Sequence, residues 1–512
     1  MSAASEARAP AQVRPRTAVD RVLEAVPIAL VALLVLGLYG VEAWTRKTPW
    51  VFSDEIEWSE ISRAISSTGH AARRGQPVHF KSLYAFLIAP VWWIHSTATA
   101  YAVLKYLNAI VMTFAAVPTY LLARMLVSKR AAIVVAFLAV AIPGMAYVTS
   151  IVPEVLAYPW YAISSWLIVR ALTRERLLDV ALAVGACVVA VLVRSPQFFT
   201  VPASLVIAGA GLWVTGPRGK AFRAGWTRSD TLGAIVLLIG GLMLFNRIVL
   251  QHVQEWQFAT QYDKNRMVDL GLRAGQSFIV GLGILPLIGG VTSLRLPERR
   301  GDPAYRAFAA YLAASIFCVA LYTAVKAAYL STIYATLTEE RNLIYLAPLL
   351  LIGTAMVFEA RQIDWRIAYG SAVFVAWLVF DKKPQLLYPY FEAPGSAILT
   401  IPTRHWQWTV EDLRWALLGV IGLSLVVLRF RRVRPVAAVA VVAVTGWMLA
   451  SQIANTVGTN TFANRFRHNL PAHLDWIDRA TGGKPVTYLG QAIIDPNGVW
   501  LTEFWNRSLK HV

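Results

Sequence analysis

Long runs of apolar residues, separated by short polar stretches, dominate the sequence between residues 22 and 453. Hydrophobic residues make up 57% of the chain and the mean hydropathy is +0.52, which excludes a soluble globular protein. A helix needs about 20 apolar residues to cross a bilayer, and several runs approach or exceed that length. The pattern predicts an all-α bundle of about 11–13 transmembrane helices. The predicted spans are residues 22–44, 99–126, 131–149, 155–172, 180–193, 198–215, 231–250, 277–293, 307–325, 343–358, 367–380, 416–428 and 436–453.

Alternate loops between these spans carry clusters of Lys and Arg. Cytoplasmic loops are enriched in these residues, so the pattern predicts a cytoplasmic N-terminus and an extracytoplasmic C-terminus. The same clusters account for the net charge of +19, and we expect no nucleic-acid partner. The predicted inner loops are residues 128–130, 174–176, 217–228, 295–306, 361–366 and 429–434.

Three regions follow from this pattern. Residues 1–21 are predicted to form a polar cytoplasmic tail, residues 22–457 the membrane domain, and residues 458–512 a small extracytoplasmic segment. The first outer loop, residues 45–98, is predicted to contain two interfacial helices. The C-terminal segment is too short to form a stable hydrophobic core of its own. It is therefore expected either to pack on the outer face of the spans or to begin a larger module.

Acidic residues open the first outer loop, directly after the first span: Asp54, Glu55, Glu57 and Glu60. Ser53 is suited to cap a helix here, and acids in a first helical turn are stabilising by about 0.3–1 kcal/mol each. Helix stabilisation alone would explain them. Carboxylates at the membrane surface are equally suited to chemistry on a lipid-linked substrate. Since adjacent helical residues point about 100° apart, we expect only one of Asp54 and Glu55 to face such a site.

The many spans, Asp54-Glu55 shortly after the first span, the interfacial helices and the sequence Lys81-Ser82-Leu83-Tyr84 together resemble the GT-C superfamily of integral membrane glycosyltransferases. The resemblance covers the topology of nearly the whole chain. It is to the branch of protein O-mannosyltransferases and lipid A aminoarabinose transferases, whose first loop has a Lys-Pro-Pro-Leu type motif where this chain has Lys81-Ser82-Leu83.

This resemblance implies a GT-C-like fold and an enzyme that takes a sugar from a polyprenyl-phosphate carrier. The acceptor would be a glycan, lipid or protein at the outer face of the plasma membrane, the inner membrane in bacteria. By the resemblance the catalytic base is Asp54, with Glu55 as the alternative. The base removes the acceptor's proton as its oxygen attacks the anomeric carbon, and one base suffices for inversion.

Glu154 is the second candidate for catalysis, at the outer start of a span. A carboxylate among apolar neighbours is costly unless it is paired or functional. It is suited to orient the acceptor, to bind a metal or to pair with Arg194. Alternatively, it merely caps the helix that starts after Pro153.

Cations are needed to stabilise the charge that develops on the departing phosphate. The candidate ligands of the donor phosphate are the cations Lys81, Lys326, Arg341 and Arg194, together with Tyr345. Arg341 is preferred because a guanidinium can hold two phosphate oxygens, and the alternative is an ion pair with Glu339 or Glu340. Arg194 is equally suited to a structural position at the membrane interface. No His or Cys spacing indicates a metal site, although two outer acids would accept Mg²⁺ or Mn²⁺.

Two other functions fit the pattern. A lipid or glycan flippase or transporter would bind its substrate with charges near mid-membrane, whereas the candidate groups here occur at span ends on one side. A catalytically inactive scaffold of cell-envelope assembly is the other alternative. Convergence of Asp54, Glu154, Lys81 and Arg341 on one site would favour the transferase.

Overall fold

A computed structural model of the chain describes residues 18–49, 53–79, 82–174, 176–248, 257, 264–333, 338–384, 386, 392–468, 471–490 and 496–511. The longer helices are α1 (Ala18–Thr45), α4 (Thr97–Thr113), α5 (Ala116–Ala123), α6 (Lys129–Ala139), α7 (Glu154–Arg174), α8 (Leu177–Val193), α9 (Thr200–Thr215), α11 (Arg228–Ile248), α13 (Lys264–Gly281), α14 (Leu285–Thr292), α15 (Pro303–Ile333), α16 (Ala347–Glu359), α17 (Trp365–Asp381), α19 (Val410–Arg429) and α20 (Arg434–His468). The short and peripheral helices are α2 (Ser53–Thr68), α3 (Tyr84–Ile88), α10 (Pro217–Arg223), α18 (Thr400–His405), α21 (Trp476–Thr481) and α22 (Pro496–Trp505).

Short 3-10 turns and two small sheets complete the fold. The 3-10 turns are η1 (Ala89–Trp93), η2 (Pro143–Thr149), η3 (Gln197–Phe199), η5 (Pro297–Arg299), η6 (Glu340–Asn342), η7 (Ile344–Leu346) and η8 (Pro394–Leu399). Strands β1 (Ala72–Arg73) and β2 (Gln76–Pro77) pair antiparallel, whereas β3 (Val486–Thr487) and β4 (Leu509–His511) pair parallel.

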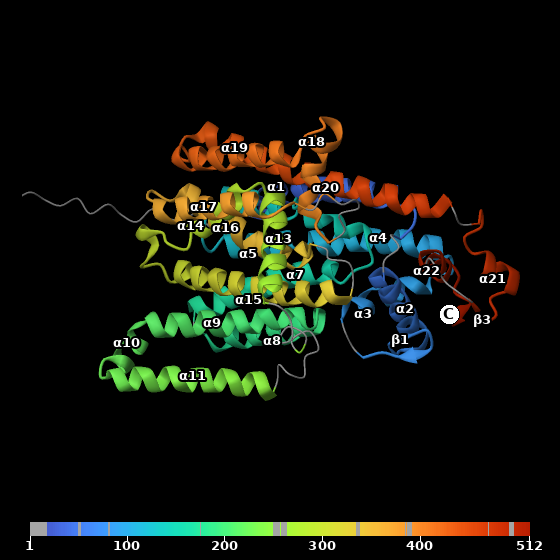
Figure 1. Ribbon diagram of the computed structural model, residues 1–512, viewed down its shortest axis with the longest axis horizontal. Helices are drawn as coiled ribbons and strands as arrows, with labels where there is room; N and C mark the ends of the chain where they lie inside the picture. The colour runs from blue at the N-terminus through green and yellow to red at the C-terminus, as the bar shows by residue number, and fades with distance from the viewer. Residues whose placement is uncertain are drawn as a thin grey trace, which may run out of the picture.

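Each predicted span coincides with a helix or with a pair of consecutive helices, and the all-α membrane fold is confirmed. Within the described residues, seven helices are long and apolar enough to cross a membrane, or up to nine if two bent pairs each count as one span. The other predicted spans fall on helices that are shorter, such as α8, or more charged, such as α19. In Figure 1 most of the long helices lie roughly side by side, with α10 at one end of the bundle and α2, α21 and α22 at the other.

Two of the predicted spans are bent. The axes of α6 and η2 differ by 55°, and those of α13 and α14 by 104°. Between α13 and α14, Gly283 and Ile284 have φ angles of 84° and 66°. A side chain disfavours this left-handed region, so the bend at Ile284 depends on the packing around it. The apolar run at residues 277–293 is therefore not one straight helix, a feature that hydropathy does not reveal.

The described residues of the predicted first outer loop form a helical cap on one end of the bundle. In α2, Trp58, Ile61 and Ile65 recur at helical spacing on one face and are buried, and the helix packs against α3 and η1. The indole of Trp92 in η1 donates a hydrogen bond to the Ser62 hydroxyl over 2.7 Å. The two interfacial helices predicted for this loop therefore correspond to α2 and to α3 with η1.

The C-terminal segment packs on this cap. The Arg63 guanidinium of α2 lies 4.3 Å from the Trp92 ring centroid and 5.0 Å from that of Phe504, and it donates to the Phe504 carbonyl over 2.6 Å. Arg74 binds both carboxylate oxygens of Glu503, over 2.9 and 2.8 Å. The last membrane helix, α20, runs through residue 457 to His468 before the segment begins.

Replacing Arg63 with Ala is expected to release α22 from α2. The change removes a charge-assisted hydrogen bond and two cation–ring contacts, worth about 3 kcal/mol together. The fraction of molecules in which α22 has separated from α2 should rise roughly hundredfold. The backbone amides of α22 should exchange hydrogen correspondingly faster. The control is Arg479→Ala, which removes an exposed pair with Asp475 and should leave that exchange unchanged. Equal exchange rates in both variants would contradict the docking role of Arg63.

Candidate functional site

Arg341 is the centre of a cluster of buried charges at the capped end of the bundle. It lies in η6, just before α16, and its side chain is 13% exposed. Its Nη2 lies 2.8 Å from Asp54 Oδ2, its Nε 2.9 Å from Glu154 Oε1, and its Nη1 3.0 Å from Glu392 Oε1. Each guanidinium nitrogen therefore meets a carboxylate from a different segment. The structure brings together Asp54, Glu154 and Arg341, three of the residues that the sequence singled out.

Glu154 joins Arg341 to a second arginine. The Glu154 carboxylate is fully buried at the start of α7, and its Oε1 lies 2.5 Å from Arg194 Nη1. The same nitrogen donates to the Tyr345 hydroxyl over 3.0 Å. The Tyr345 ring packs against Tyr161 and Phe198, which fixes that hydroxyl in place. The predicted pair of Glu154 and Arg194 is thus present, and Tyr345 belongs to the same network.

Glu55 faces a different part of the structure from Asp54. Its Oε1 accepts a hydrogen bond from the Ile151 backbone N–H over 2.9 Å, and its Oε2 lies 4.0 Å from Arg46 Nη2. Both side chains of this pair are fully buried, and Arg46 also donates to Asn460 of α20. The divergence agrees with the 100° rotation between adjacent helical residues. Of the two candidate bases, Asp54 is the one in contact with Arg341.

Glu340, one of the two near neighbours suggested as a partner of Arg341, is bound elsewhere. It accepts hydrogen bonds from the Ser277 hydroxyl and the Gly395 N–H, over 2.5 and 2.7 Å. The charge of the other neighbour, Glu339, does act on Arg341, together with carboxylates from distant segments. Glu392, which the sequence did not single out, lies in the loop before η8 and carries no spacing signal that would have identified it.

The cluster contains more carboxyl groups than cations. Asp54, Glu154, Glu339 and Glu392 interact with Arg341, and Arg194 and Lys326 are the two further cations that interact with members of this set. Burial raises the pKa of Glu392 well above its ordinary value, since Arg341 offsets only part of the desolvation and Glu339 adds repulsion. Burial likewise raises the pKa of Glu339. Both shifts favour the protonated form of these two carboxyl groups.

The remaining predicted phosphate ligands are placed as follows. Lys326 lies over the Tyr329 ring at 4.8 Å and lowers the pKa of Glu339 by its charge, so it belongs to the edge of the cluster. Lys81 lies outside the described residues. In the described part of the chain, no group of three or more His, Cys, Asp or Glu residues has an arrangement suited to hold a metal ion.

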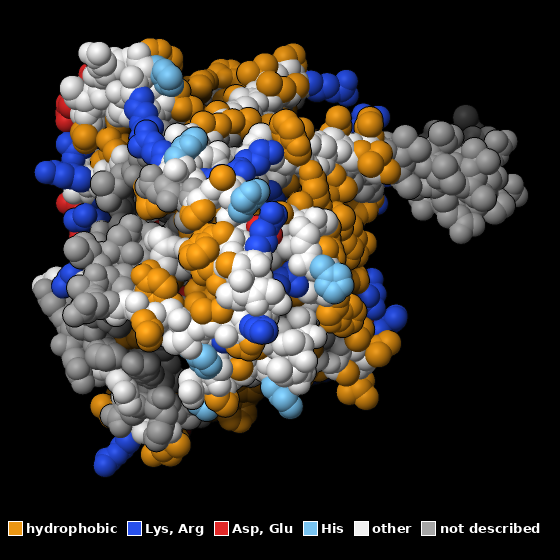
Figure 2. All heavy atoms as spheres, turned by 90° about the vertical axis from the view of Figure 1, so that its right-hand side faces the viewer, with side chains coloured by type: hydrophobic (Ala, Val, Ile, Leu, Met, Phe, Trp, Pro, Cys, Tyr) orange, Lys and Arg blue, Asp and Glu red, His pale blue; other side chains and the backbone are white. Residues whose placement is uncertain are grey.

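Figure 2 faces the end of the molecule that holds the cluster. Lys, Arg and His side chains are spread across this face, and little acidic surface is visible. The carboxylates are present at this end but are largely withdrawn from solvent: Glu154 is 0% exposed and Glu392 17%. The end therefore presents a cationic surface around a buried acidic cluster, and such a surface attracts anionic ligands.

Solved structures with a similar fold include ArnT from Cupriavidus metallidurans bound to undecaprenyl phosphate. The TM-score is 0.54 at 13% identity, over 96% of this chain and 85% of that one. The archaeal oligosaccharyltransferase AglB from Archaeoglobus fulgidus, in complex with an inhibitory peptide and a dolichol-phosphate, gives a TM-score of 0.41 at 14% identity, over 80% of this chain and 56% of that one. No protein-family model and no curated protein matches the sequence. The likeness to ArnT extends over nearly the whole chain and confirms the GT-C-like fold expected from the sequence.

Replacing Glu392 with Gln is expected to change how the stability of the protein depends on pH. A carboxyl whose pKa is raised on folding stabilises the fold fully below its ordinary pKa, and this contribution is lost as the pH rises through the folded value. In the wild type, stability should therefore fall as the pH rises above the ordinary glutamate pKa of about 4.3, by at most about 1.4 kcal/mol per pH unit for this group. The stability of the Glu392→Gln variant should change less with pH. The measurement is the apparent Tm in detergent at each pH.

Glu411→Gln is the matched control, because Glu411 is 56% exposed and lies away from the cluster in α19. It should keep the wild-type dependence on pH. If Glu392→Gln also kept that dependence, the raised pKa of Glu392 would be contradicted.

Proposed function

We propose that the chain is a glycosyltransferase that takes a sugar from a polyprenyl-phosphate donor and transfers it to an acceptor hydroxyl at the outer face of the plasma membrane. One observation carries the proposal. Asp54, Glu154 and Arg341 come from distant segments and converge at one end of a fold that resembles ArnT bound to undecaprenyl phosphate. The acceptor would be a glycan, a lipid or a protein.

Asp54 is the proposed general base. It is 28% exposed, the most accessible of the three carboxylates in contact with Arg341, so an acceptor can reach it. The acceptor oxygen forms a bond to the anomeric carbon, and its proton passes to Asp54. The bond from that carbon to the phosphate oxygen breaks, and its electron pair leaves with the polyprenyl phosphate. Inversion follows from attack opposite the leaving group.

Arg341, Arg194, Lys326 and Tyr345 are the proposed ligands of the donor phosphate. In the structure both arginines are paired with carboxylates, so a phosphate would share them with Asp54 and Glu154. The raised pKa values of Glu339 and Glu392 support this, because they favour the neutral forms and so reduce the negative charge that the phosphate meets. Glu154 is then a positioning residue that fixes both guanidinium groups.

The position of the cluster favours an enzyme over a flippase or transporter. Asp54 lies in the first turn of α2, Glu154 begins α7 and Arg341 directly precedes η7 and α16. All three are at the ends of helices on one side of the bundle. A transporter needs a site near mid-membrane that opens to both sides.

Asp54→Asn is expected to lower transfer by roughly 10²–10⁴-fold, because asparagine cannot accept the proton. Glu55→Gln should retain most of the activity, since glutamine keeps an oxygen for the Ile151 N–H. Glu57→Gln is the matched control on the same helix, where Glu57 pairs with Arg73 rather than Arg341. The measurement is release of undecaprenyl phosphate from undecaprenyl-phosphate-linked pentoses and hexoses by the purified protein. Full activity of Asp54→Asn would reject it as the base.

Cysteine labelling tests the orientation. Both native cysteines, Cys187 and Cys318, are buried, so they give little background. Ser67→Cys at the end of α2 and Ser229→Cys at the start of α11 place exposed thiols at opposite ends of the bundle. In intact cells, a membrane-impermeant maleimide should label position 67 and spare position 229. The reverse pattern would place the cluster on the cytoplasmic side and would contradict the proposed transfer at the outer face.

A further inference from the structure

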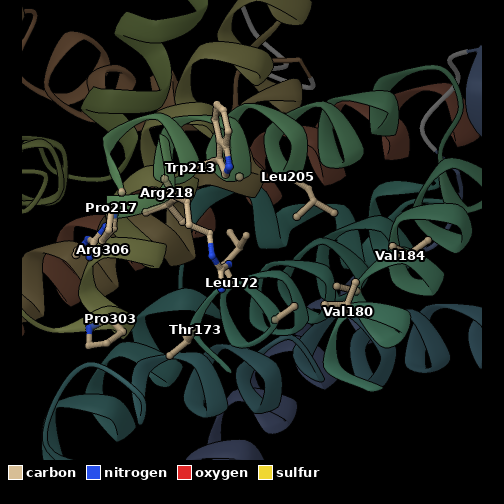
Figure 3. A pocket seen from close by; sticks show the side chains of 15 residues that line it. Leu172, Thr173, Val180, Val184, Leu205, Trp213, Pro217, Arg218, Pro303 and Arg306 are labelled. Atoms are coloured by element: carbon tan, nitrogen blue, oxygen red, sulfur yellow. The ribbon is translucent and has the colours of Figure 1, made fainter. Parts of the chain in front are cut away.

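A cavity of about 600 Å³ opens between α7, α8, α9 and α15, beside α10. Its walls are mostly apolar and include Leu172, Val184 and Leu205. In Figure 3, Pro217, Pro303 and Arg306 lie toward one end of the lining, and Val180 and Val184 lie toward the other. A cavity of this size matches the volume of a small-molecule site.

The cavity lies at the opposite end of the bundle from Arg341. Helix α7 begins at Glu154, in the charged cluster, and its last residues, Ala171 to Thr173, line the cavity. The 21 residues of α7 span about 30 Å, which is the thickness of the hydrocarbon core. The cavity therefore faces the other leaflet, which is the inner leaflet in the predicted orientation, and plays no part in sugar transfer.

The depth of the cavity suits an acyl chain. Val184 lies seven residues from the start of α8, and Leu205 lies ten residues from the end of α9. At 1.5 Å per residue, the apolar walls extend about 10–15 Å from the membrane surface toward its centre. Water in the cavity would gain no hydrogen bonds from such walls. Hydrocarbon is therefore the ligand that fills the cavity with the lowest cost in free energy.

The mouth of the cavity is positively charged, whereas its walls are apolar. Arg218 and Arg306 are the ionisable side chains among the described residues that line it. Trp213 lies beside them and packs against Phe222, and Phe222 packs against Trp226. Tryptophan is enriched at the depth of lipid headgroups, so the two arginines lie where lipid phosphates lie.

Arg306 also lines a second cavity of about 550 Å³ on the other side of the end of α9. That cavity includes Arg295 and Arg300. The end of α9 is therefore flanked by two grooves that share a cation. This concentration of positive charge favours an anionic headgroup over a zwitterionic one.

We propose that this cavity is a binding site for an anionic phospholipid of the leaflet at the α10 end. Its phosphate contacts Arg218 and Arg306, and an acyl chain lies along Leu172, Val184 and Leu205. The site combines a cationic mouth with an apolar groove between membrane helices. A soluble phosphate would contact the mouth alone and leave the groove unfilled.

The test measures the lipids that remain bound to the full-length protein after purification. Protein is reconstituted in nanodiscs of equal phosphatidylglycerol and phosphatidylethanolamine and extracted with mild detergent, and the retained lipids are counted by native mass spectrometry. Wild-type protein should retain phosphatidylglycerol preferentially. Arg218→Gln with Arg306→Gln should lower this preference roughly tenfold. The matched control, Arg361→Gln with Arg366→Gln, removes one exposed arginine from the loop before α17 and one from the first turn of α17, and it should keep the preference.

A second variant fills the groove without touching the charges. A Cβ at Gly209 of α9 would lie 3.9 Å from the nearest atom, Leu172 Cδ2, so Gly209→Leu extends into open space and favours the helix. It should abolish phosphatidylglycerol retention. Gly185→Leu adds the same side chain to the exposed surface of α8 and should have no effect. Equal retention of the two lipids by the wild type, or unchanged preference in both the Arg218/Arg306 and Gly209 variants, would overturn the proposal.

Discussion

The charged cluster at the capped end of the molecule depends on a single guanidinium. Arg341 contacts carboxylates from α2, from the start of α7 and from the loop before η8, and these contacts join segments that are far apart in the sequence. Burying these charges is costly, and the cost is offset only when each carboxylate keeps its partner. Loss of a partner from such a pair destabilises a protein by about 3–5 kcal/mol. The position of Asp54 is therefore tied to that of Glu154.

Asp54 is also held independently of Arg341. Its neighbour Glu55 caps the Ile151 N–H directly before α7, so α2 is fixed to the segment that carries Glu154. At the other end of the same helix, Arg63 binds the carbonyl of Phe504. Helix α2 thus approaches Arg341 with its orientation set at both ends. A base held in this way needs little rearrangement to meet an acceptor, which is the condition for effective catalysis by positioning.

Much of the fold could be predicted from the sequence because a membrane span must satisfy its backbone hydrogen bonds internally. Apolar runs therefore become helices, and the spacing of Ile61 and Ile65 revealed α2. The partners of Arg341 could not be predicted in the same way. Glu340 is adjacent in sequence, yet the 3-10 turn directs its carboxylate to Ser277 and Gly395. Asp54 is 287 residues from Arg341, and Glu392 lies in a loop without periodicity.

The two ends of the bundle are chemically different but share helix α7. Helix α7 carries Glu154 at one end and borders the arginine-lined cavity at the other. A cavity between helices removes packing contacts, and the helices around it are held less firmly than those of a filled core. A lipid in the groove would restore those contacts between α7, α8 and α9.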